Sequence, residues 1–360
     1  MKILCLIDSL GNGGAERQII GLTQFLSQRG YDVSLVTYYD CNFYLDLMDK
    51  HEIKTINLAV KNTPLSKLVT IRRHIQKNRY DWVIAYKDGP TIIGCLLKMF
   101  GNRFRLIVSE RNTTQSLTCK ERIKFFLYKW ANYIVPNSYA QERFIVEHFP
   151  KLKSKTVTIT NFTDISYFTP LAHSSNSDEI EVITVARIAA QKNVLTYLDA
   201  VRKIVDSGLR VHFSWYGNVQ SGQEEYGKLC FSKVQELNLE NNFHFYPATT
   251  QIVSKYQSAD IFCLPSKYEG YPNVICEAMS CGKPIAASRI CDNPYIVEEN
   301  NNALLFNPQD LDDMIQTLLK ICSYAKEQLH KMGKESRKIA IKKFSEATFA
   351  DKYESILKSY

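Results

Sequence analysis

The sequence predicts an α/β protein with two doubly wound domains, each built around a parallel sheet, that face each other across a cleft. Its 360 residues suit two domains of ordinary size. Short apolar runs alternate with longer helix-patterned stretches in both halves, which is typical of βαβ units. A segment rich in Ser, Asn and Asp at residues 169–179 has the composition of a linker between the halves.

The apolar runs predict one set of strands for each domain. In the first half the predicted strands are Ile3–Ile7, Val33–Thr37, Trp82–Ala85, Leu106–Ser109, Tyr133–Val135 and Val157–Thr160. In the second half they are Val182–Val185, Val211–Trp215, Phe243–Phe245, Ile261–Leu264, Pro284–Ala287 and Ala303–Leu305. We expect domains at residues 1–170 and 171–344, with a last helix at about 345–360 that packs back onto the first domain.

Composition narrows the class of protein. The chain is 45% hydrophobic and 23% charged, which is ordinary for a soluble globular protein. Its ten cysteines form no CxxC pair and its seven histidines form no HxxxH pair, so no metal site is expected. Scattered cysteines fit a reducing cytosol. The first apolar run is cut short by Asp8 and reads as a strand, so we expect a cytoplasmic protein that is not integral to a membrane.

Charge is divided unequally between the halves. Residues 1–172 contain 24 Lys+Arg and 14 Asp+Glu, a net of +10, whereas residues 173–360 have a net of −2. A basic domain beside a near-neutral one suggests that the first domain meets an anionic surface. The anionic partner could be either a nucleic acid or an acidic lipid.

The first candidate site is the glycine-rich turn after the first strand, Gly11 to Arg17. Gly13 and Gly14 let a ligand approach the backbone, and the helix that follows presents unpaired N–H groups to an anion. A dinucleotide fingerprint would have glycine where Glu16 stands, although Asp40 could serve as its ribose-binding acid. The alternative is a tight strand-to-helix turn without a ligand.

The second candidate site follows the first strand of the second domain. Arg187 and Lys192 lie five residues apart on a loop that opens into a helix, so both could reach one diphosphate. Arginine supplies a fork of donors and lysine a point charge. The alternative is a pair of solvated surface cations.

The third candidate site is the most specific. A Gly/Pro-rich loop after Leu264 leads into a helix that begins near Asn273. Glu269 lies in the loop, where it can meet sugar hydroxyls, and Glu277 lies one turn into the helix, where it can accept from a ribose diol. Apolar neighbours of Glu277 indicate that this helix is buried, and a buried carboxylate needs partners. The alternative for Glu277 is a solvent-facing helix charge.

These motifs together resemble the retaining glycosyltransferases of family 4, which have a fold of two Rossmann-like domains called GT-B. The resemblance rests mainly on Glu269 and Glu277, separated by seven residues and followed by Ala278-Met279 and a Gly-x-Pro at Gly282 and Pro284. Arg187, Lys192 and Asn193 match the family's phosphate-binding loop, and Gly13 to Glu16 match its glycine loop. Asn137-Ser138, Asn161 and Phe168 resemble its markers in the first domain. The resemblance covers nearly the whole chain.

The resemblance implies roles for these residues. Arg187 and Lys192 would hold the donor diphosphate and stabilise the leaving group, Glu277 would hold the ribose and Glu269 the sugar, with Glu269, Arg187 and Lys192 catalytic. The full set of implied donor-binding residues is Gly13, Gly14, Arg187, Lys192, Glu269, Gly270, Tyr271, Pro272, Asn273, Val274 and Glu277. The donor would be a nucleotide-diphosphate sugar, with UDP expected as the nucleotide, and the acceptor a lipid-linked or lipopolysaccharide glycan. No metal or cofactor is expected, because the two cations replace a divalent ion.

The sequence departs from the family pattern after the fourth predicted strand. Many members have a histidine there, near the donor sugar, and this chain reads Ser109-Glu110-Arg111-Asn112. Two alternatives are open: Glu110 or Asn112 takes over the sugar contact, or the contact is lost.

A basic amphipathic helix at residues 120–130 is a candidate membrane surface. Ile123, Phe126, Leu127 and Trp130 share one face, and the cations are largely off it. The predicted membrane residues are Lys120, Arg122, Lys124, Phe126, Lys129 and Trp130. Aromatics flanked by cations suit an anionic bilayer, so we expect peripheral attachment to the inner face of the cytoplasmic membrane. The alternative is a helix whose apolar face packs in the core.

Two alternative functions are compatible with parts of the sequence. A nicotinamide-dependent oxidoreductase is suggested by the Gly11–Gly14 loop and Asp40, but Glu16 and the two-glutamate motif argue against it. A non-catalytic nucleic-acid-binding protein is suggested by the basic half, but the chain has no recognisable reader motif, so no nucleic-acid partner is expected.

Overall fold

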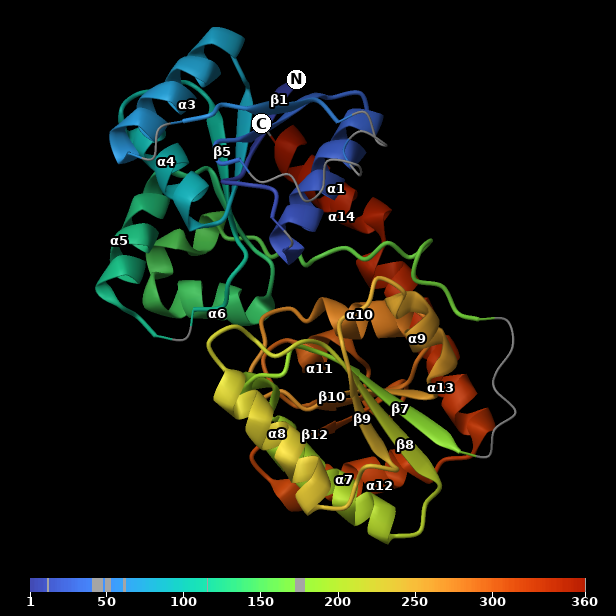
Figure 1. Cartoon of the computed structure of the whole chain (residues 1–360). Helices are drawn as coiled ribbons and strands as arrows, with labels where there is room; N and C mark the ends of the chain where they lie inside the picture. The colour runs from blue at the N-terminus through green and yellow to red at the C-terminus, as the bar shows by residue number, and fades with distance from the viewer. Residues whose placement is uncertain are drawn as a thin grey trace. The chain divides into compact units, whose positions relative to one another are not determined.

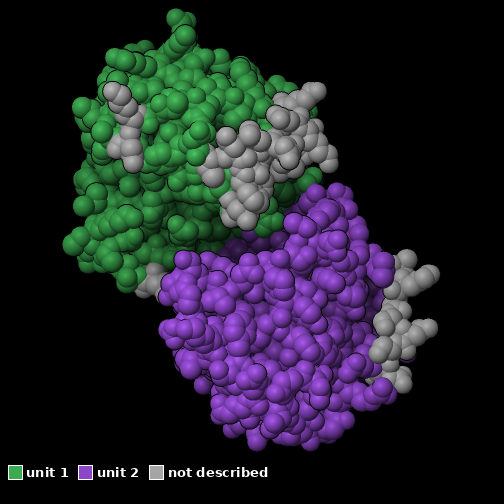
Figure 2. Space-filling model, in the orientation of Figure 1, with its two compact units in different colours: residues 1–162, 346–360 green, residues 163–345 purple. Residues whose placement is uncertain are grey.

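The computed structural model describes residues 1–11, 13–40, 48, 53–60, 63–114, 116–171 and 179–359. The chain forms two compact units, coloured separately in Figure 2. Unit 1 comprises Met1–Phe162 and Glu346–Tyr360, and unit 2 comprises Thr163–Ser345. Most of the predicted linker falls on residues 172–178, which lie outside the described residues.

Unit 1 contains one parallel sheet, six-stranded within the described residues, in the order β3-β2-β1-β4-β5-β6. Its strands are β1 Lys2–Leu6, β2 Asp32–Thr37, β3 Thr55–Asn57, β4 Trp82–Tyr86, β5 Arg105–Glu110 and β6 Tyr133–Pro136. Its helices are α1 Gly14–Gln28, α3 Pro64–Asn78, α4 Asp88–Met99, α5 Cys119–Leu127, α6 Tyr139–His148 and α14 Glu346–Lys358, with 3-10 turns η1 Tyr128–Trp130 and η2 Pro150–Lys155. The strand order reverses direction between β1 and β4, which is the switch point where such sheets bind ligands.

Both faces of this sheet are buried, which is why its central strands are apolar throughout. On one face α1 and α14 share a core with β1 and β4, and Figure 1 shows these two helices side by side. Phe349 and Tyr353 carry the contact from α14. Arg29, the C-cap residue of α1, adds ion pairs to Asp351 and Glu354, both at 2.6 Å. The C-terminal helix is therefore part of the first unit.

Unit 2 repeats the architecture, with a six-stranded parallel sheet in the order β12-β11-β10-β7-β8-β9. Its strands are β7 Ile180–Val185, β8 Val211–Tyr216, β9 Phe243–Tyr246, β10 Ile261–Leu264, β11 Ile285–Ser288 and β12 Ala303–Phe306. Its helices are α7 Val194–Asp206, α8 Glu224–Glu236, α9 Ile252–Ser258, α10 Asn273–Ser280, α11 Asn293–Ile296, α12 Leu311–Cys322 and α13 Lys326–Phe344, with a 3-10 turn η3 Ala190–Lys192. Here the switch point lies between β7 and β10.

Helices cover both faces of the second sheet as well. Helices α7, α8 and α12 share one core with it, and α9, α10 and α13 share another. The close approach of α13 to the end of α10 depends on two glycines. A Cβ on Gly333 would lie 2.1 Å from the carbonyl oxygen of Gly282, which itself has a left-handed φ of +70°. This packing holds the helix that carries Glu277.

One predicted strand is wrong, and one strand was missed. Val157–Thr160 is not a strand, although the N–H groups of Val157 and Ile159 donate to Ile134 and Pro136 of β6. A parallel ladder would need an N–H from position 136 in return, and Pro136 has none. The sixth strand is β3 at the other edge, whose side chains are exposed or half-buried and so lack the apolar run that marks a strand.

The boundary between the units also differs from the predicted residue 170. Residues 163–170 belong to unit 2, because the N–H of Thr163 donates to Phe344 and the Arg337 guanidinium donates to the carbonyls of Ile165 and Phe168. Phe168, which the sequence had assigned to the first domain, is buried in the core beneath α9 and α10. The linker composition thus begins after the structural boundary.

The α13–α10 contact generates a first prediction. In an open helix, replacing glycine by alanine stabilises by about 1 kcal/mol. We expect Gly333→Ala instead to lower the free energy of unfolding by about 1–3 kcal/mol, because the new methyl group collides with the Gly282 carbonyl. Denaturant unfolding measures the change. Lys334→Ala, at the exposed neighbouring position, is the matched control and should change stability by less than about 0.5 kcal/mol. An equally stable or more stable Gly333→Ala would contradict this packing.

Candidate functional site

The candidate site lies at the carboxyl edge of the unit 2 sheet, at its switch point. Arg187 and Lys192 follow β7, and Glu269 follows β10. Because β7 and β10 are hydrogen-bonded neighbours, their two loops leave the sheet side by side. Lys192 and Glu269, 77 positions apart in the sequence, thereby become neighbours.

Backbone and side-chain bonds fasten the two loops to each other. The N–H of Lys267 donates to the carbonyl of Gln191 at 2.8 Å, and Gln191 Nε2 donates to the carbonyl of Tyr268 at 2.9 Å. Asn193 then takes a left-handed conformation (φ 59°, ψ 34°), and its buried amide donates to the Pro308 carbonyl at 3.1 Å. The loop that carries the two cations is therefore held on both sides of Lys192, by Gln191 and Asn193.

Lys192 forms an ion pair with Glu269 across these loops. The pair is largely buried, with exposed side-chain fractions of 13% and 10%. The same carboxylate oxygen, Oε1, accepts a hydrogen bond of 2.6 Å from the buried Ser266 hydroxyl. A carboxylate at this depth needs hydrogen-bond donors, because burial removes it from water. Lys192 and Ser266 supply them.

Glu277 lies on the inner side of α10 and is only 7% exposed. Tyr256 of α9 donates a hydrogen bond of 3.1 Å to its Oε2. This burial and this partner exclude the solvent-facing alternative for Glu277. The start of α10 also presents N–H groups that favour negative charge.

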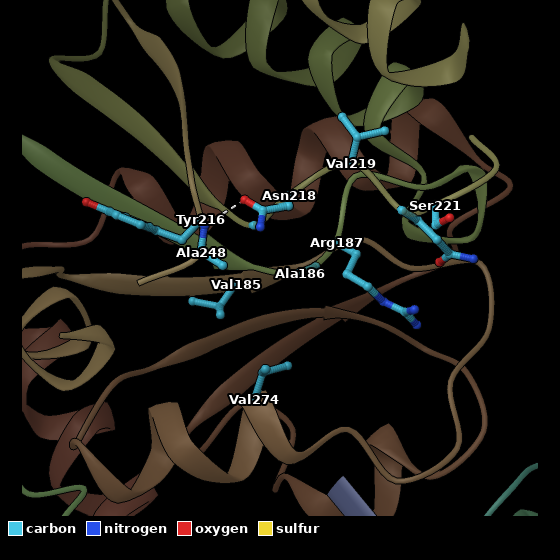
Figure 3. Close-up of a pocket in the computed structure, with 11 residues that line it drawn as sticks. Val185, Ala186, Arg187, Tyr216, Asn218, Val219, Ser221, Ala248 and Val274 are labelled. Carbon is cyan, nitrogen blue, oxygen red and sulfur yellow. Dashed lines mark hydrogen bonds between the residues drawn. The ribbon is translucent and has the colours of Figure 1, made fainter. Parts of the chain in front are cut away.

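A pocket of about 530 Å³ opens beside Arg187, between the ends of β7 and β8 and the start of α10. Figure 3 shows Val185 and Val274 pointing toward each other across it, with Arg187 next to them. The Arg187 side chain is exposed and makes no hydrogen bond or ion pair within the described residues. It is therefore available to an anionic ligand.

The wall of the pocket after β8 depends on one glycine. Gly217 has φ +156°, and a Cβ there would lie 2.0 Å from the carbonyl oxygen of Ala186. Next to it, Asn218 Oδ1 accepts a hydrogen bond of 3.1 Å from the N–H of Ala248, the contact drawn as a dashed line in Figure 3. This bond orients the amide, so its NH₂ group is the end left to donate to a ligand.

Unit 2 thus brings together most of the predicted donor-binding residues, from Arg187 and Lys192 to Glu269 and Glu277. Gly270, Tyr271 and Pro272 form the loop between Glu269 and the first residues of α10, Asn273 and Val274. Gly13 and Gly14 belong to unit 1, at the start of α1, and Asn12 between Gly11 and Gly13 lies outside the described residues. Their contact with a donor stays a prediction.

Glu110 has a structural role that replaces its predicted sugar contact. Its side chain is 1% exposed, Lys124 Nζ donates to its Oε2 at 2.9 Å, and the Tyr128 hydroxyl donates to its Oε1. Burial raises the pKa of Glu110, against the opposing effect of Lys124. Burial acts to lower the pKa of Lys124, but the carboxylates of Glu110 and Asp88 outweigh it and raise that pKa. Asn112 is exposed, and its predicted role stays open.

The predicted membrane helix corresponds to α5 and η1, and one of its residues is misassigned. Lys124 is 3% exposed and faces Glu110, so it cannot meet a membrane. The alternative of a core-packed apolar face is also wrong for two residues, because Ile123 and Phe126 are 62% and 58% exposed. Lys129 Nζ lies 3.8 Å from the Phe126 ring centre and 4.1 Å from that of Trp130. Lys120 and Arg122 are exposed as well.

Sequence reasoning missed the residues that support the site. Ser266 stood inside the glutamate motif, three positions before Glu269, and its spacing could have suggested the contact. Tyr256 and Asn218 had no comparable signal, because their partners are distant in sequence. The sequence signal for the pocket wall was Gly217, a glycine two residues beyond the predicted strand Val211–Trp215.

The site therefore combines two cations, a buried carboxylate and a cavity at a helix start. A diphosphate would find Arg187 and Lys192, and a diol would find a carboxylate acceptor at Glu277. Within the described residues, no group of three or more His, Cys, Asp or Glu side chains is placed to hold a metal ion. No described helix has the length and apolar character needed to cross a bilayer.

Comparison with known families agrees with this geometry. Residues 12–167 match the model of the Glycosyltransferase Family 4, and residues 170–339 match that of the Glycosyl transferases group 1. The two matches together span nearly all of both units.

Individual relatives are similar over most of the chain. The amylovoran biosynthesis glycosyltransferase AmsD of Erwinia amylovora is 24% identical over 84% of this chain and 87% of its own. The UDP-Gal:α-D-GlcNAc-diphosphoundecaprenol α-1,3-galactosyltransferase of Escherichia coli is 21% identical over 95% and 93%. The chain is also similar to Anabaena HepE, whose crystal structure in complex with UDP superposes with a TM-score of 0.87. The two sequences are 21% identical, and the match covers 100% of each chain. This last likeness shows that the fold is shared.

The buried pair in unit 1 yields a prediction. Lys124→Met should lower the free energy of unfolding by about 3–5 kcal/mol, because it leaves Glu110 as an uncompensated buried charge. Lys120→Met, at a side chain that is 71% exposed, is the matched control and should have little effect. Adding Glu110→Gln to Lys124→Met should recover part of the loss. If the single and double variants are equally unstable in denaturant unfolding, the charge pair is not the cause.

Proposed function

The chain belongs to the retaining glycosyltransferases of group 1 and family 4, and from this premise we propose that it transfers a sugar from a UDP-sugar to a lipid-linked glycan in the assembly of a surface polysaccharide. Membership of the family argues against a nicotinamide-dependent oxidoreductase and against a non-catalytic nucleic-acid-binding protein. The observation that carries the proposal is the buried pair of Lys192 and Glu269 at the unit 2 switch point, with Arg187 lining a pocket at the same sheet edge and Glu277 buried on α10.

The geometry of unit 2 supports a donor role for each of these residues. Arg187 and Lys192 bind the diphosphate and stabilise the charge that develops on it as the glycosidic bond breaks. Glu277, buried and held by Tyr256, accepts from the ribose hydroxyls. Glu269, held by Ser266 and Lys192, contacts the donor sugar. UDP is the proposed nucleotide because the similar HepE has been crystallised with UDP and with UDP-glucose.

The proposed acceptor class rests on relatives. The E. coli relative is named for a diphosphoundecaprenol acceptor, and the Campylobacter jejuni relative, 24% identical over 86% of this chain, is named for an undecaprenol-linked one. AmsD is named for amylovoran biosynthesis. A lipid-linked acceptor stays at the bilayer, so the enzyme must come to a cytoplasmic membrane surface.

The exposed face of α5 and η1 is the proposed membrane contact. Lys120, Arg122 and Lys129 supply positive charge around the exposed Ile123 and Phe126. Cations attract acidic headgroups and apolar side chains insert at the headgroup boundary. Lys124 is excluded from this surface by its burial.

The direct test is release of UDP from a panel of UDP-hexoses and UDP-N-acetylhexosamines, with and without diphosphoundecaprenol-linked sugars. We expect one donor to be consumed in the presence of one acceptor, and the anomeric configuration of the donor to be retained. Wild type that binds no UDP, or turns over no member of the panel, would count against the proposal.

The two glutamates should act on different parts of the donor. Glu277→Ala should weaken UDP binding roughly 10- to 100-fold in calorimetry, because the ribose loses an ionised acceptor worth about 1.5–3 kcal/mol. Glu269→Ala should lower kcat with a smaller effect on UDP affinity. Glu327→Ala, at an exposed position in the first turn of α13, serves as a matched surface control. Normal UDP affinity in both site variants, with normal turnover, would remove the assignment.

Arg187 and Lys192 should serve the leaving diphosphate. Arg187→Met and Lys192→Met are expected to lower kcat by about 10²–10³-fold and to affect UDP affinity less, since the charge grows in the transition state. Activity should persist in EDTA, because these cations take the role of a divalent ion. Lys267→Met, a cation on the adjoining loop, is the control and should retain activity. A strict requirement for added Mg²⁺ or Mn²⁺ would contradict this account.

Binding to anionic vesicles should depend on the exposed face of α5 and η1. We expect co-sedimentation with phosphatidylglycerol vesicles that falls with added salt, since each cation near such a surface is worth about 1 kcal/mol. Replacing Lys120, Arg122 and Lys129 by Glu should abolish most of it, whereas replacing the exposed Lys151, Lys153 and Lys203 by Glu should not. Equal sedimentation of the two folded variants would mean that α5 is not the contact.

A further inference from the structure

Unit 1 contains a second set of charged side chains at the corresponding place in its own sheet. Its switch point lies between β1 and β4, where Asp8 follows β1 and Lys87 follows β4. Lys87 Nζ lies 2.9 Å from Asp8 Oδ1 and 2.6 Å from Oε1 of Glu16, which is in the first turn of α1. In unit 2 the switch point is likewise spanned by a lysine and a carboxylate, Lys192 and Glu269. Ligands of doubly wound sheets bind at this position.

The backbone of Lys87 is held in an unusual conformation. Its φ of 70° and ψ of 164° fall in a region that is occupied almost only by glycine, so a lysine there is strained. The two carboxylates hold the ammonium group, and α4 begins at the next residue. Burial acts to lower the pKa of Lys87, but Glu16 and Asp8 raise it overall. The group that fixes Asp8 is therefore itself charged and fixed.

Asp8 has one anchored oxygen and one that remains available. Its Oδ1 accepts from Lys87 and, at 2.8 Å, from the N–H of Ser9. Its Oδ2 receives no hydrogen bond from any residue that the structure describes. The Asp8 side chain is 29% exposed, whereas that of Glu16 is 7% exposed. Asp8 thus presents a fixed acceptor to solvent at the switch point, and Glu16 acts behind it.

The ion pair of Glu110 and Lys124, at the same edge of the unit 1 sheet, has no available carboxylate oxygen. Glu110 and Lys124 are 1% and 3% exposed, and both oxygens of Glu110 are engaged within the protein. That pair has only a structural role. A purely structural role for the Asp8 group would explain the contact between Lys87 and Glu16, but not a partly exposed carboxylate with an unused oxygen.

We propose that Asp8 accepts a hydrogen bond from a hydroxyl of the acceptor sugar, and that Lys87 and Glu16 are positioning residues. The proposal deepens the proposed function and rests on it. The three groups have a formal net charge of −1, so at Asp8 itself a neutral polyol is favoured over a phosphate or diphosphate. A pyranose supplies hydroxyl donors, and hydrogen bonds to an ionised carboxylate are the stronger kind. The ligand is therefore a sugar ring of the acceptor and not its phosphate groups.

The test measures binding of sugars to protein saturated with UDP. Ligand-observed saturation-transfer NMR would use the methyl α-glycosides of glucose, galactose, N-acetylglucosamine and N-acetylgalactosamine, and calorimetry would follow UDP. In Asp8→Asn, which keeps the shape but turns the available oxygen into a donor, we expect the affinity for the bound sugar to fall roughly 10- to 100-fold. UDP affinity should change much less, because Arg187, Lys192, Glu269 and Glu277 all lie in unit 2.

Further variants distinguish sugar binding at Asp8 from binding in the donor site and from a loss of stability. If the sugar binds at Asp8, Glu269→Ala should retain the saturation-transfer signal. If the sugar binds in the donor site instead, the signal should be lost in Glu269→Ala and kept in Asp8→Asn. Glu110→Gln should lose stability without losing sugar binding. Lys87→Gly and Lys87→Met should both weaken sugar binding, with the glycine variant melting at the higher temperature because it relieves the backbone.

The outcomes distinguish a failure of the Asp8 assignment from a failure of the proposed glycosyltransferase function. Wild type that binds no UDP would overturn the proposed function. Wild type that binds UDP but no sugar of the panel, or Asp8→Asn that binds the sugar as well as wild type, would overturn the assignment of Asp8 alone.

Discussion

The pairing of parallel strands at the two switch points is the constraint on which both sites depend. In unit 2, the register that sets Ile261 beside Val182 and Phe262 beside Ile183 brings the ends of β10 and β7 to the same edge. The loops that follow can then exchange hydrogen bonds, and Lys192 can reach Glu269. In unit 1, the pairing of β1 with β4 places Asp8 beside Lys87 in the same way. A shift of either register would separate the charges.

Burial on both faces of each sheet explains why polar chemistry is concentrated at that edge. Helices cover the sheets on both sides, so the strands themselves must be apolar. Polar side chains near the sheet are tolerated where a partner is within reach. Glu277 has Tyr256, and Glu110 has Lys124 and Tyr128. Removing such a partner costs far more than the pair contributes, because it leaves a buried charge without compensation.

The two cations of the unit 2 site differ in whether they already have a partner. Lys192 is already paired with Glu269, which Ser266 also contacts, while Arg187 is exposed and has no ion pair in the described part of the chain. An arriving diphosphate therefore meets one cation without a competitor and a second that a carboxylate already orients. Asn218, turned by the Ala248 N–H, borders the same pocket from the other side.

Much of the fold was predictable because apolar runs in buried parallel strands are strong signals. The strand Ile261–Leu264 was predicted with its observed bounds, and most others lay within one or two residues. The failures have specific causes. β3 is an exposed edge strand and has no apolar run. Val157–Thr160 has such a run, but Pro136 on its neighbour cannot return a hydrogen bond.

The sequence by itself determined the residue types at the strand ends: Arg187, Lys192, Glu269 and Glu277 could be chosen because polar residues after an apolar strand lie at the ligand-binding edge. Only the tertiary structure decided which of them have partners, since the contacts between Lys192 and Glu269 or Tyr256 and Glu277 join different elements. It also decided that Lys124 faces Glu110 while Phe126 faces solvent. Helical spacing shows which residues share a face, and the packing of the neighbouring elements determines which face is buried.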